Sequence, residues 1–410
     1  MLKLAVVVDT FPRWSERFVA RELSELKRRK VDFDVFCLAS GRLPGAETAS
    51  GCETEWQGLL ERRIVLPATF SAKAMAAALG RLPKLKASLY AKVRPDISDE
   101  LGLMDLLRLA RARALEAALI KGKYGHVHAH FAGLTSSVAW LAAKAAHLPL
   151  SISVHARDLF VEPQLLTQKL SDCARIFTCH EHARLHLLGK ATTEADSVRY
   201  RDRVLLMRHG LPLEHFAFKS RNGHSGRQRP LRILAAGRLV PKKGFEHLID
   251  ALDHSSLAGR DIRLTLLGEG PEAKSLRQRI RSMKRKKIVS LVPPLTGGEL
   301  RDAFANSDVF VAPYQKAADG DVDGVPNVVL EAFALGLPVI GTTAGGLREI
   351  LNAETGRPVP PGSAEALADA LVAVMEAPKE AQRRAKCARG LIERDYNIRK
   401  NIMPLMALFS

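Results

Sequence analysis

Two acidic residues near a predicted helix start could bind hydroxyl groups beside a phosphate. Asp323 precedes the predicted helix in DGVPNVVLEAFALGLPV, and Glu331 lies about one turn inside it. The amides at the start of such a helix form an anion site, here those of Asn327, Val328 and Val329. A buried carboxylate beside a phosphate is repelled unless it holds hydroxyl groups. The alternative is an ordinary capped helix with one solvated glutamate.

Two cations stand close together in the segment GRLVPKKG, directly after a predicted strand at 231–236. Arg238 can grip a phosphate through its bidentate fork, and Lys243 can act as a point charge, so the pair suits a diphosphate. The alternative is a pair of solvated loop residues. The next Gly-x-Gly turn, at 268–270, lacks the third glycine of a dinucleotide fingerprint, so the sequence does not support a nicotinamide or flavin site.

Histidines end two predicted strands of the first half, in HVHAHF (126–131) and SVHARD (153–158). His126, His128 and His130 alternate along their strand and therefore share one face. Taken alone, such histidines are more often packed or hydrogen-bonded. A metal site formed by these three residues stays open as an alternative.

Short β-branched runs alternate with helix-like stretches along the chain, and this alternation predicts parallel sheets covered by helices. The predicted strands are 4–8, 33–37, 126–130, 150–154, 174–178, 204–207, 231–236, 263–267, 289–292, 309–312 and 338–341. The predicted helices are 16–29, 101–121, 245–252, 272–284 and 328–335. The fold class is therefore α/β, with two doubly wound Rossmann-like domains facing across a cleft.

The expected domain limits follow from a polar, proline-ended stretch after which the strand–helix pattern restarts. We expect a first domain at 1–218, a linker at 219–230, a second domain at 231–390 and a C-terminal helix at 391–410 that could pack back onto the first domain. Residues 70–125 read as a basic helical insertion, either solvated or facing anionic lipid.

The charge favours an anionic partner, because 62 Lys and Arg exceed 44 Asp and Glu by 18 in a chain of 410 residues. The run at 274–287 holds eight basic residues and no acid, either as a solvated helix face or as a membrane-facing patch. An RNA-binding motif and a helix-turn-helix signal are both missing from the sequence, which disfavours nucleic acid. Five cysteines without a C-x-x-C pair, and no apolar stretch long enough to span a membrane, indicate a cytoplasmic protein.

The GRLVPKKG and DGVPNVVLEAFALGLPV segments resemble the retaining glycosyltransferases of family 4, which have the GT-B fold. The resemblance covers roughly residues 229–375. The family signature is a pair of acids separated by seven residues and followed by A-x-A-x-G-x-P-V, and Asp323 and Glu331 have that spacing before AFALGLPV. The first acid of the family is usually Glu. The shorter side chain of Asp323 could alter contact with the donor sugar.

The resemblance implies a role for each matching residue. Glu331 would hold the ribose hydroxyls, and Arg238 and Lys243 would neutralise the donor diphosphate. Asp323, with Gly324 and the amides that follow, would grip the transferred sugar. The family needs no metal or other cofactor for this work, so the Asp-rich string at 319–323 is expected to form an acidic loop. A D-x-D metal site is the alternative.

HAHFA and HARD resemble segments of a family branch that builds bacterial exopolysaccharides. By that resemblance His155 contacts the donor sugar near its reacting carbon and is a catalytic candidate together with Asp323. His130 and Asp158 are candidate contacts of the acceptor or the sugar. TFPRWSERF resembles the F-P-x-x-S-E-x-F opening of the same branch, which would place Ser15 and Glu16 near the acceptor. Ser15 could equally cap a helix.

We therefore expect a retaining, metal-independent hexosyltransferase that moves a hexose from a UDP- or GDP-sugar to a glycan or lipid-linked saccharide in cell-surface polysaccharide synthesis. The first domain would bind the acceptor and the second the nucleotide-sugar. The enzyme would work in the cytoplasm, peripherally at the anionic inner face of a membrane. The alternatives are a nucleotide-sugar epimerase, or another GT-B enzyme that is not a transferase, and a non-enzymatic binder of an anionic polymer.

Overall fold

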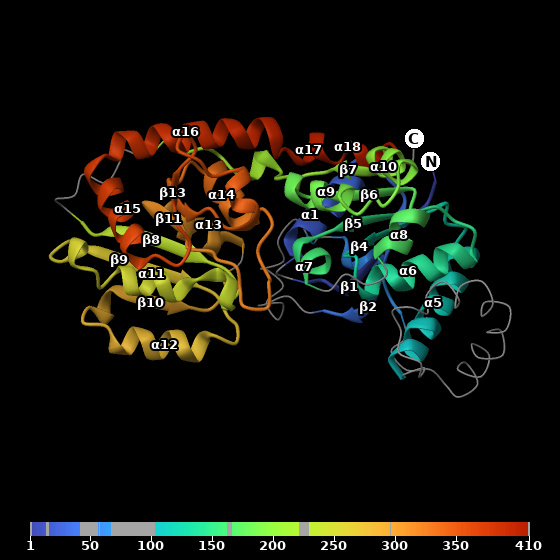
Figure 1. Ribbon diagram of the computed structural model, residues 1–410, viewed down its shortest axis with the longest axis horizontal. Coiled ribbons are helices and arrows are strands. Elements are labelled where there is room, and N and C mark those ends of the chain that lie inside the picture. The colour runs from blue at the N-terminus through green and yellow to red at the C-terminus, as the bar shows by residue number, and fades with distance from the viewer. Residues whose placement is uncertain are drawn as a thin grey trace. The chain divides into compact units, whose positions relative to one another are not determined.

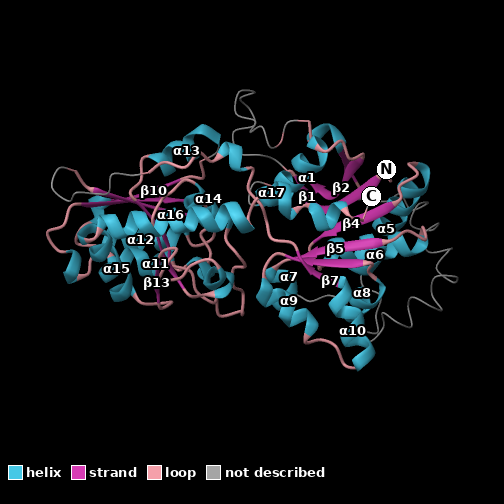
Figure 2. Ribbon diagram, turned by 90° about the horizontal axis from the view of Figure 1, so that it is seen from above, coloured by secondary structure: helices cyan, strands magenta, loops and turns pink. Residues whose placement is uncertain are grey.

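The computed structural model describes residues 2–13, 16–41, 56, 58–66, 103–161, 166–220, 229–295 and 297–408. The chain forms two compact units. The N-terminal domain runs to Met207 and also takes up Ile402–Ser410, and the C-terminal domain contains Arg208–Asn401. In both domains the strands lie among covering helices (Figures 1 and 2).

The N-terminal domain contains a parallel sheet of seven strands in the order β3-β2-β1-β4-β5-β6-β7. The sheet grows outward from the β1–β4 pair in both directions, which is the doubly wound pattern. Its strands are β1 (Leu4–Phe11), β2 (Phe33–Ser40), β3 (Arg63–Val65), β4 (His126–His130), β5 (Leu150–Val154), β6 (Arg175–Thr178) and β7 (Val204–Leu206). Its helices are α1 (Arg17–Arg28), α5 (Leu103–Lys121), α6 (Leu134–Ala145), α7 (Ala156–Phe160), α8 (Leu166–Asp172), α9 (Glu181–Leu188) and α10 (Glu194–Arg203), together with α18 (Met403–Met406).

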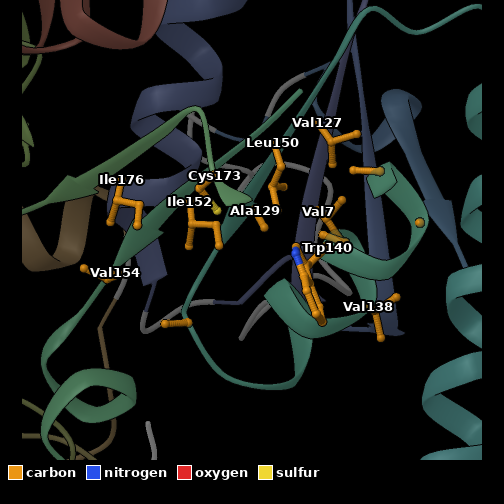
Figure 3. Close-up of a cluster of buried hydrophobic side chains, with 14 of the residues drawn as sticks. Val7, Val127, Ala129, Val138, Trp140, Leu150, Ile152, Val154, Cys173 and Ile176 are labelled. Atoms are coloured by element: carbon orange, nitrogen blue, oxygen red, sulfur yellow. The ribbon is translucent and has the colours of Figure 1, made fainter. Parts of the chain in front are cut away.

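One face of this sheet packs a hydrophobic core against α5 and α6. Val127 and Ala129 of β4 point into that core, where they gather with Ile152 and with Trp140 of α6 (Figure 3). Because side chains alternate along a strand, the histidines of β4 are directed to the opposite face. The hydrophobic pattern of β4 thus decides where its polar residues lie.

The C-terminal domain contains a parallel sheet of six strands in the order β10-β9-β8-β11-β12-β13. Its strands are β8 (Leu231–Ala236), β9 (Ile262–Leu267), β10 (Val289–Val292), β11 (Val309–Ala312), β12 (Val339–Thr342) and β13 (Arg357–Val359). Its helices are α11 (Phe245–Ala251), α12 (Ala273–Ser282), α13 (Gly297–Ala305), α14 (Asn327–Ala334), α15 (Ala364–Glu376), α16 (Pro378–Asp395) and α17 (Ile398–Asn401). Two Rossmann-like parallel sheets confirm the expected fold class.

The domain boundary differs from the expected one and falls between Met207 and Arg208. Residues after it already pack on the C-terminal domain, because Leu211 forms a parallel bridge with Asn397 and its amide donates to Tyr396 O at 2.7 Å. Of the expected linker, residues 221–228 lie outside the described part of the chain. The expected C-terminal helix at 391–410 is also divided, since Ile402 and Leu405 are buried with the core of the N-terminal domain.

The expected basic insertion at 70–125 lies partly outside the described residues, which resume at Leu103 with α5. Within α5, Ala112, Leu115 and Leu119 are buried in the same core as α6. Their spacing places them on one face of the helix. This part of the expected insertion therefore belongs to the main core of the domain.

Candidate functional site

Two lysines that follow β8 form ion pairs with two aspartates of the loop that follows β11. Lys243 Nζ lies 2.6 Å from Asp323 Oδ2, and Lys242 Nζ lies 3.0 Å from Asp321 Oδ1 and 3.2 Å from Asp323 Oδ1. Strands β8 and β11 are parallel neighbours, so their carboxyl ends meet at one sheet edge. The topology thus brings together charges that are distant in sequence.

The environment of Asp323 keeps its carboxylate charged. Burial opposes ionisation, but Lys243 and Lys242 overcome it and hold the pKa of Asp323 below its ordinary value. Lys243 also lies over the ring of Tyr314, with Nζ 4.0 Å from the ring centroid, as in a cation–π contact. Burial and the charge of Asp323 raise the pKa of Tyr314, which keeps the phenol neutral. The ammonium of Lys243 is thereby held from two sides.

The two predicted cations, Lys243 and Arg238, differ in their surroundings. Lys243 is buried, whereas Arg238 is exposed in the loop after β8 and its guanidinium forms no ion pair or hydrogen bond with any described residue. An ammonium has three donor hydrogens, so Lys243 keeps donors for an anion while Asp323 accepts from it. Both cations can therefore meet a phosphate, Lys243 as a fixed charge and Arg238 as a mobile fork.

The start of α14 lies directly after this loop. Pro326 occupies the cap position, and Glu331 is buried further along the helix. Of the three amides expected to bind an anion, that of Val329 instead donates to Pro326 O at 3.0 Å. The amides of Asn327 and Val328 remain at the helix end, and Asn327 Oδ1 is buried without a hydrogen-bond partner among the described residues.

Two glycines hold the backbone of Asp323 and Gly324 in place. A Cβ atom added to Gly345 would lie 2.1 Å from Asp323 O, and one added to Gly346 would lie 2.6 Å from Gly324 C. Gly346 N also donates to Asp323 O at 3.0 Å. Only glycines allow this close approach of backbone to backbone.

Five residues of this arrangement were not predicted from the sequence. The signals that could have located them are the first lysine of P-K-K, the middle aspartate of D-G-D-V-D and the Gly-Gly pair after β12. These residues are Lys242, Tyr314, Asp321, Gly345 and Gly346.

In the N-terminal domain, His155 follows β5 and begins α7 as its cap residue. Its ring centroid lies 4.5 Å from that of Phe131 and 4.8 Å from that of Phe18. The ring of His130 is nearly parallel to that of His155, with centroids 6.1 Å apart, and His130 Nε2 lies 3.7 Å from Glu22 Oε2. The structure thus brings two of the predicted histidines together in an aromatic cluster.

Asp158 acts on this cluster through the backbone. Its carboxylate accepts from His155 N at 3.0 Å and from Ala132 N. The buried Lys169 donates to Ala132 O at 2.6 Å, so an acid and a base hold the two sides of the same residue. Burial raises the pKa of Asp158 to about 7 and lowers that of Lys169 to about 7. In the structure Asp158 thus positions the backbone of His155 and Ala132, and its contact with an acceptor or sugar stays a prediction.

The two other histidines of β4 are packed and hydrogen-bonded. Ser151 Oγ lies 2.8 Å from both His126 Nε2 and His128 Nδ1, and Ser153 Oγ lies 3.2 Å from His128 Nε2. Burial lowers the pKa of His126 to about 4 and that of His128 well below its ordinary value. Both nitrogens of His128 therefore face serine hydroxyls, which favours the structural role over the metal alternative.

The N-terminal loop is described only in part. Ser15 lies outside the described residues. Glu16 precedes α1 at its cap position, and its Oε1 lies 3.0 Å from Arg13 Nη1. A role for either residue toward an acceptor stays a prediction.

Comparison with known proteins identifies the class of this fold. Over the whole chain, the structure resembles HepE of Anabaena, solved in complex with UDP and glucose, with a TM-score of 0.70, 16% identity, and coverage of 100% of this chain and 99% of that one. At this identity the likeness concerns the fold, which is GT-B.

The sequence matches are concentrated in part of the chain. Residues 230–377 match the family described as glycosyl transferases group 1. A putative colanic acid biosynthesis glycosyltransferase, WcaL of Escherichia coli K12, is 31% identical over 199 residues, 48% of each chain. The amylovoran biosynthesis glycosyltransferase AmsK of Erwinia amylovora is 30% identical over 197 residues, again 48% of each. The matches thus span about half the length of these curated relatives, and they confirm the resemblance to exopolysaccharide glycosyltransferases.

Proposed function

We propose that this chain is a retaining, metal-independent glycosyltransferase that moves a hexose from a UDP- or GDP-sugar to a hydroxyl of a glycan or lipid-linked saccharide. The observation that carries the proposal is the placement of Lys243 and Asp323 beside the start of α14, with Glu331 buried in the same helix. The group 1 match covers all of these residues, and relatives named for polysaccharide synthesis support the assignment. We propose that the enzyme acts in the cytoplasm, as a peripheral protein at an anionic membrane face.

The donor would be held by contacts of distinct chemistry. Glu331 accepts from the ribose hydroxyls. Lys243, Arg238 and the amides of Asn327 and Val328 bind the diphosphate. Asp323 and the backbone at Gly324 grip the sugar. These groups stabilise the negative charge that grows on the diphosphate as the glycosidic bond breaks.

The proposed transfer of the hexose needs no nucleophilic side chain of the protein. The bond from the anomeric carbon to the phosphate oxygen breaks, the acceptor oxygen bonds to the same face of that carbon, and the acceptor proton passes to the departing phosphate. In the described loop the carboxylates of Asp321 and Asp323 form ion pairs with lysines. This engagement supports cationic side chains, rather than a D-x-D metal, as the partners of the diphosphate.

The test is a screen of the purified protein against UDP- and GDP-sugars for nucleoside diphosphate release with chelator present, followed by the anomeric configuration of the product. We expect Glu331→Ala and Lys243→Ala to lose donor binding and turnover. The matched controls Glu365→Ala and Lys379→Ala change exposed residues of the same domain and should keep both.

Thermal unfolding shows whether each variant is folded, and Lys243→Arg keeps the charge if Lys243→Ala is unstable. The proposal fails if no nucleotide-sugar binds, or if both site variants behave like their controls. Inversion of configuration or a strict metal requirement would overturn the mechanism. Release of an epimerised nucleotide-sugar without transfer would identify an epimerase.

A further inference from the structure

A basic surface lies on the outside of the C-terminal domain, on α12 and the turn after it. The segment 274–287 contains eight Lys and Arg residues and no acid. Helix α12 lies at the outside of the domain near the edge strand β10 (Figure 1). The α12 basic face is formed by the exposed side chains of Lys274, Arg277, Arg281, Lys284, Lys286 and Lys287.

Helical spacing and packing direct these charges outward. Lys274, Arg277 and Arg281 recur at intervals of three and four, so they form a stripe along one side of α12. Leu276 and Met283 are buried in the core of the domain. The apolar side of the segment is therefore covered by its own domain, and the basic side meets the surroundings.

Little of this charge is neutralised within the domain. The other two basic residues of the segment have partners: Arg279 donates to both carboxylate oxygens of Asp250 at 2.7 Å, and Arg285 donates to Leu257 O at 2.8 Å. Across the described chain, the side-chain cations of the α12 basic face have no carboxylate within ion-pair distance, and the nearby Asp253 carboxylate accepts from the backbone amide of Lys284 at 2.9 Å. Six like charges left together are complementary to an extended anionic surface.

We propose that the α12 basic face docks the C-terminal domain onto an anionic phospholipid bilayer. The evidence for this docking surface is the charge and packing of the segment. Only its purpose, to bring the enzyme to a lipid-linked acceptor, rests on the proposed function. Segment 274–287 has no aromatic residue on which bases could stack, so the bilayer is favoured over single-stranded nucleic acid. The exposed large apolar side chains of the described residues all lie outside this segment. The contact is therefore electrostatic and reversible, without insertion.

The test is cosedimentation of the full chain with phosphatidylcholine vesicles, with and without phosphatidylglycerol, over a range of salt concentrations. The test variant is K274Q/R277Q/R281Q, and glutamine preserves helix propensity. The matched control K379Q/K386Q/K400Q removes the same charge from exposed sites elsewhere in the domain. A loss of roughly fivefold per basic residue near the surface predicts that the test variant binds about one hundredfold more weakly at low salt.

The expected result is binding that requires phosphatidylglycerol, weakens with salt, and is lost in the test variant but retained by the control. The proposal is overturned if the test variant keeps wild-type partitioning, if the control loses as much, or if salt has no effect. It is also overturned if the face binds an oligonucleotide but no vesicle. Nucleotide-sugar binding is measured in parallel, so failure of the enzyme assignment is seen separately from failure of the surface.

Discussion

Replacing Gly345 by alanine tests whether close backbone packing holds the loop that contains Asp323. Gly345 has a φ of +55°, and its added Cβ would lie 2.1 Å from Asp323 O and 2.6 Å from Val322 Cγ2. Gly362 provides the matched control, because its φ is +76° and nothing lies within 4 Å of its added Cβ. The two substitutions share the conformational cost and differ in the overlap.

The magnitudes follow from these two costs. The left-handed conformation costs an alanine about 1–2 kcal/mol, which should be the whole effect in G362A. Overpacking adds about 1–3 kcal/mol in G345A, or else the Asp323 peptide moves away. A total loss of about 2–5 kcal/mol is smaller than the usual stability of a domain, so G345A should still fold unless the wild type is only marginally stable. We expect G345A to lose more stability than G362A. We also expect it to bind the donor at least tenfold more weakly, which corresponds to a loss of roughly 1.4 kcal/mol of binding free energy.

The measurements are urea unfolding of both variants and titration with UDP and GDP. Urea unfolding reports the free energy of unfolding, and titration reports the geometry of the loop. Equal losses of stability in G345A and G362A, together with unchanged nucleotide affinity in both, would refute the argument that Gly345 fixes the position of Asp323. If neither nucleotide binds to the wild type, the stability comparison still tests the packing.

Three further predictions concern buried ionisable side chains. Because the folded-state pKa values of His126 and His128 are depressed, their stabilising effect is present above about pH 6.5 and is lost as the pH falls, by up to about 1.4 kcal/mol of unfolding free energy per pH unit for each histidine. In urea unfolding, the variant with both histidines changed to glutamine should lose stability less steeply as the pH falls, and an unchanged slope of stability against pH would contradict this. Lys242→Met should cost about 3–5 kcal/mol, and Asp321→Asn should cost less because Lys242 keeps a second carboxylate at 3.2 Å; the reverse order in thermal unfolding would show that the pairing is misassigned. Because the folded-state pKa of Asp158 is raised to about 7, the contribution of Asp158 to the stability of the wild type falls as the pH rises from about 4 to 7. The difference in free energy of unfolding between Asp158→Asn and the wild type should therefore shift in favour of the variant over that range, and a constant difference would count against it.

The central strands were predictable because their hydrophobic runs are buried on both faces. Strands β4, β5, β8 and β11 have the limits that the sequence indicates. The edge strand β10 also has its predicted limits, although it is only partly buried. Two further strands, β3 and β13, were missed. Each has three residues at a sheet edge and a single neighbour, so neither needs a continuous apolar run, and β13 contains a proline.

The domain boundary was misplaced for a different reason. The polar stretch at 219–230 has the composition of a linker, but the preceding residues contain Leu211 and Phe216, which are buried in the core of the C-terminal domain. Their partners lie on the last helices of that domain, where Arg389 Nη1 donates to Phe216 O at 2.6 Å. Composition reports solvent exposure, whereas the boundary depends on contacts with residues far along the chain.

The sequence by itself determined the alternation of strands and helices and the positions of Asp323, Glu331, Arg238 and Lys243, because these depend on local periodicity and on a short motif. Only the tertiary structure decided how these charges are used. The pairing of Lys243 with Asp323 joins residues 80 positions apart, and it arises because β8 and β11 are neighbours in the sheet. Similarly, the buried carboxylate of Asp158 accepts from the backbone amides of Ala132 and His155, which only the fold brings to it. Residue types set the available chemistry, and the order of the strands sets which groups meet.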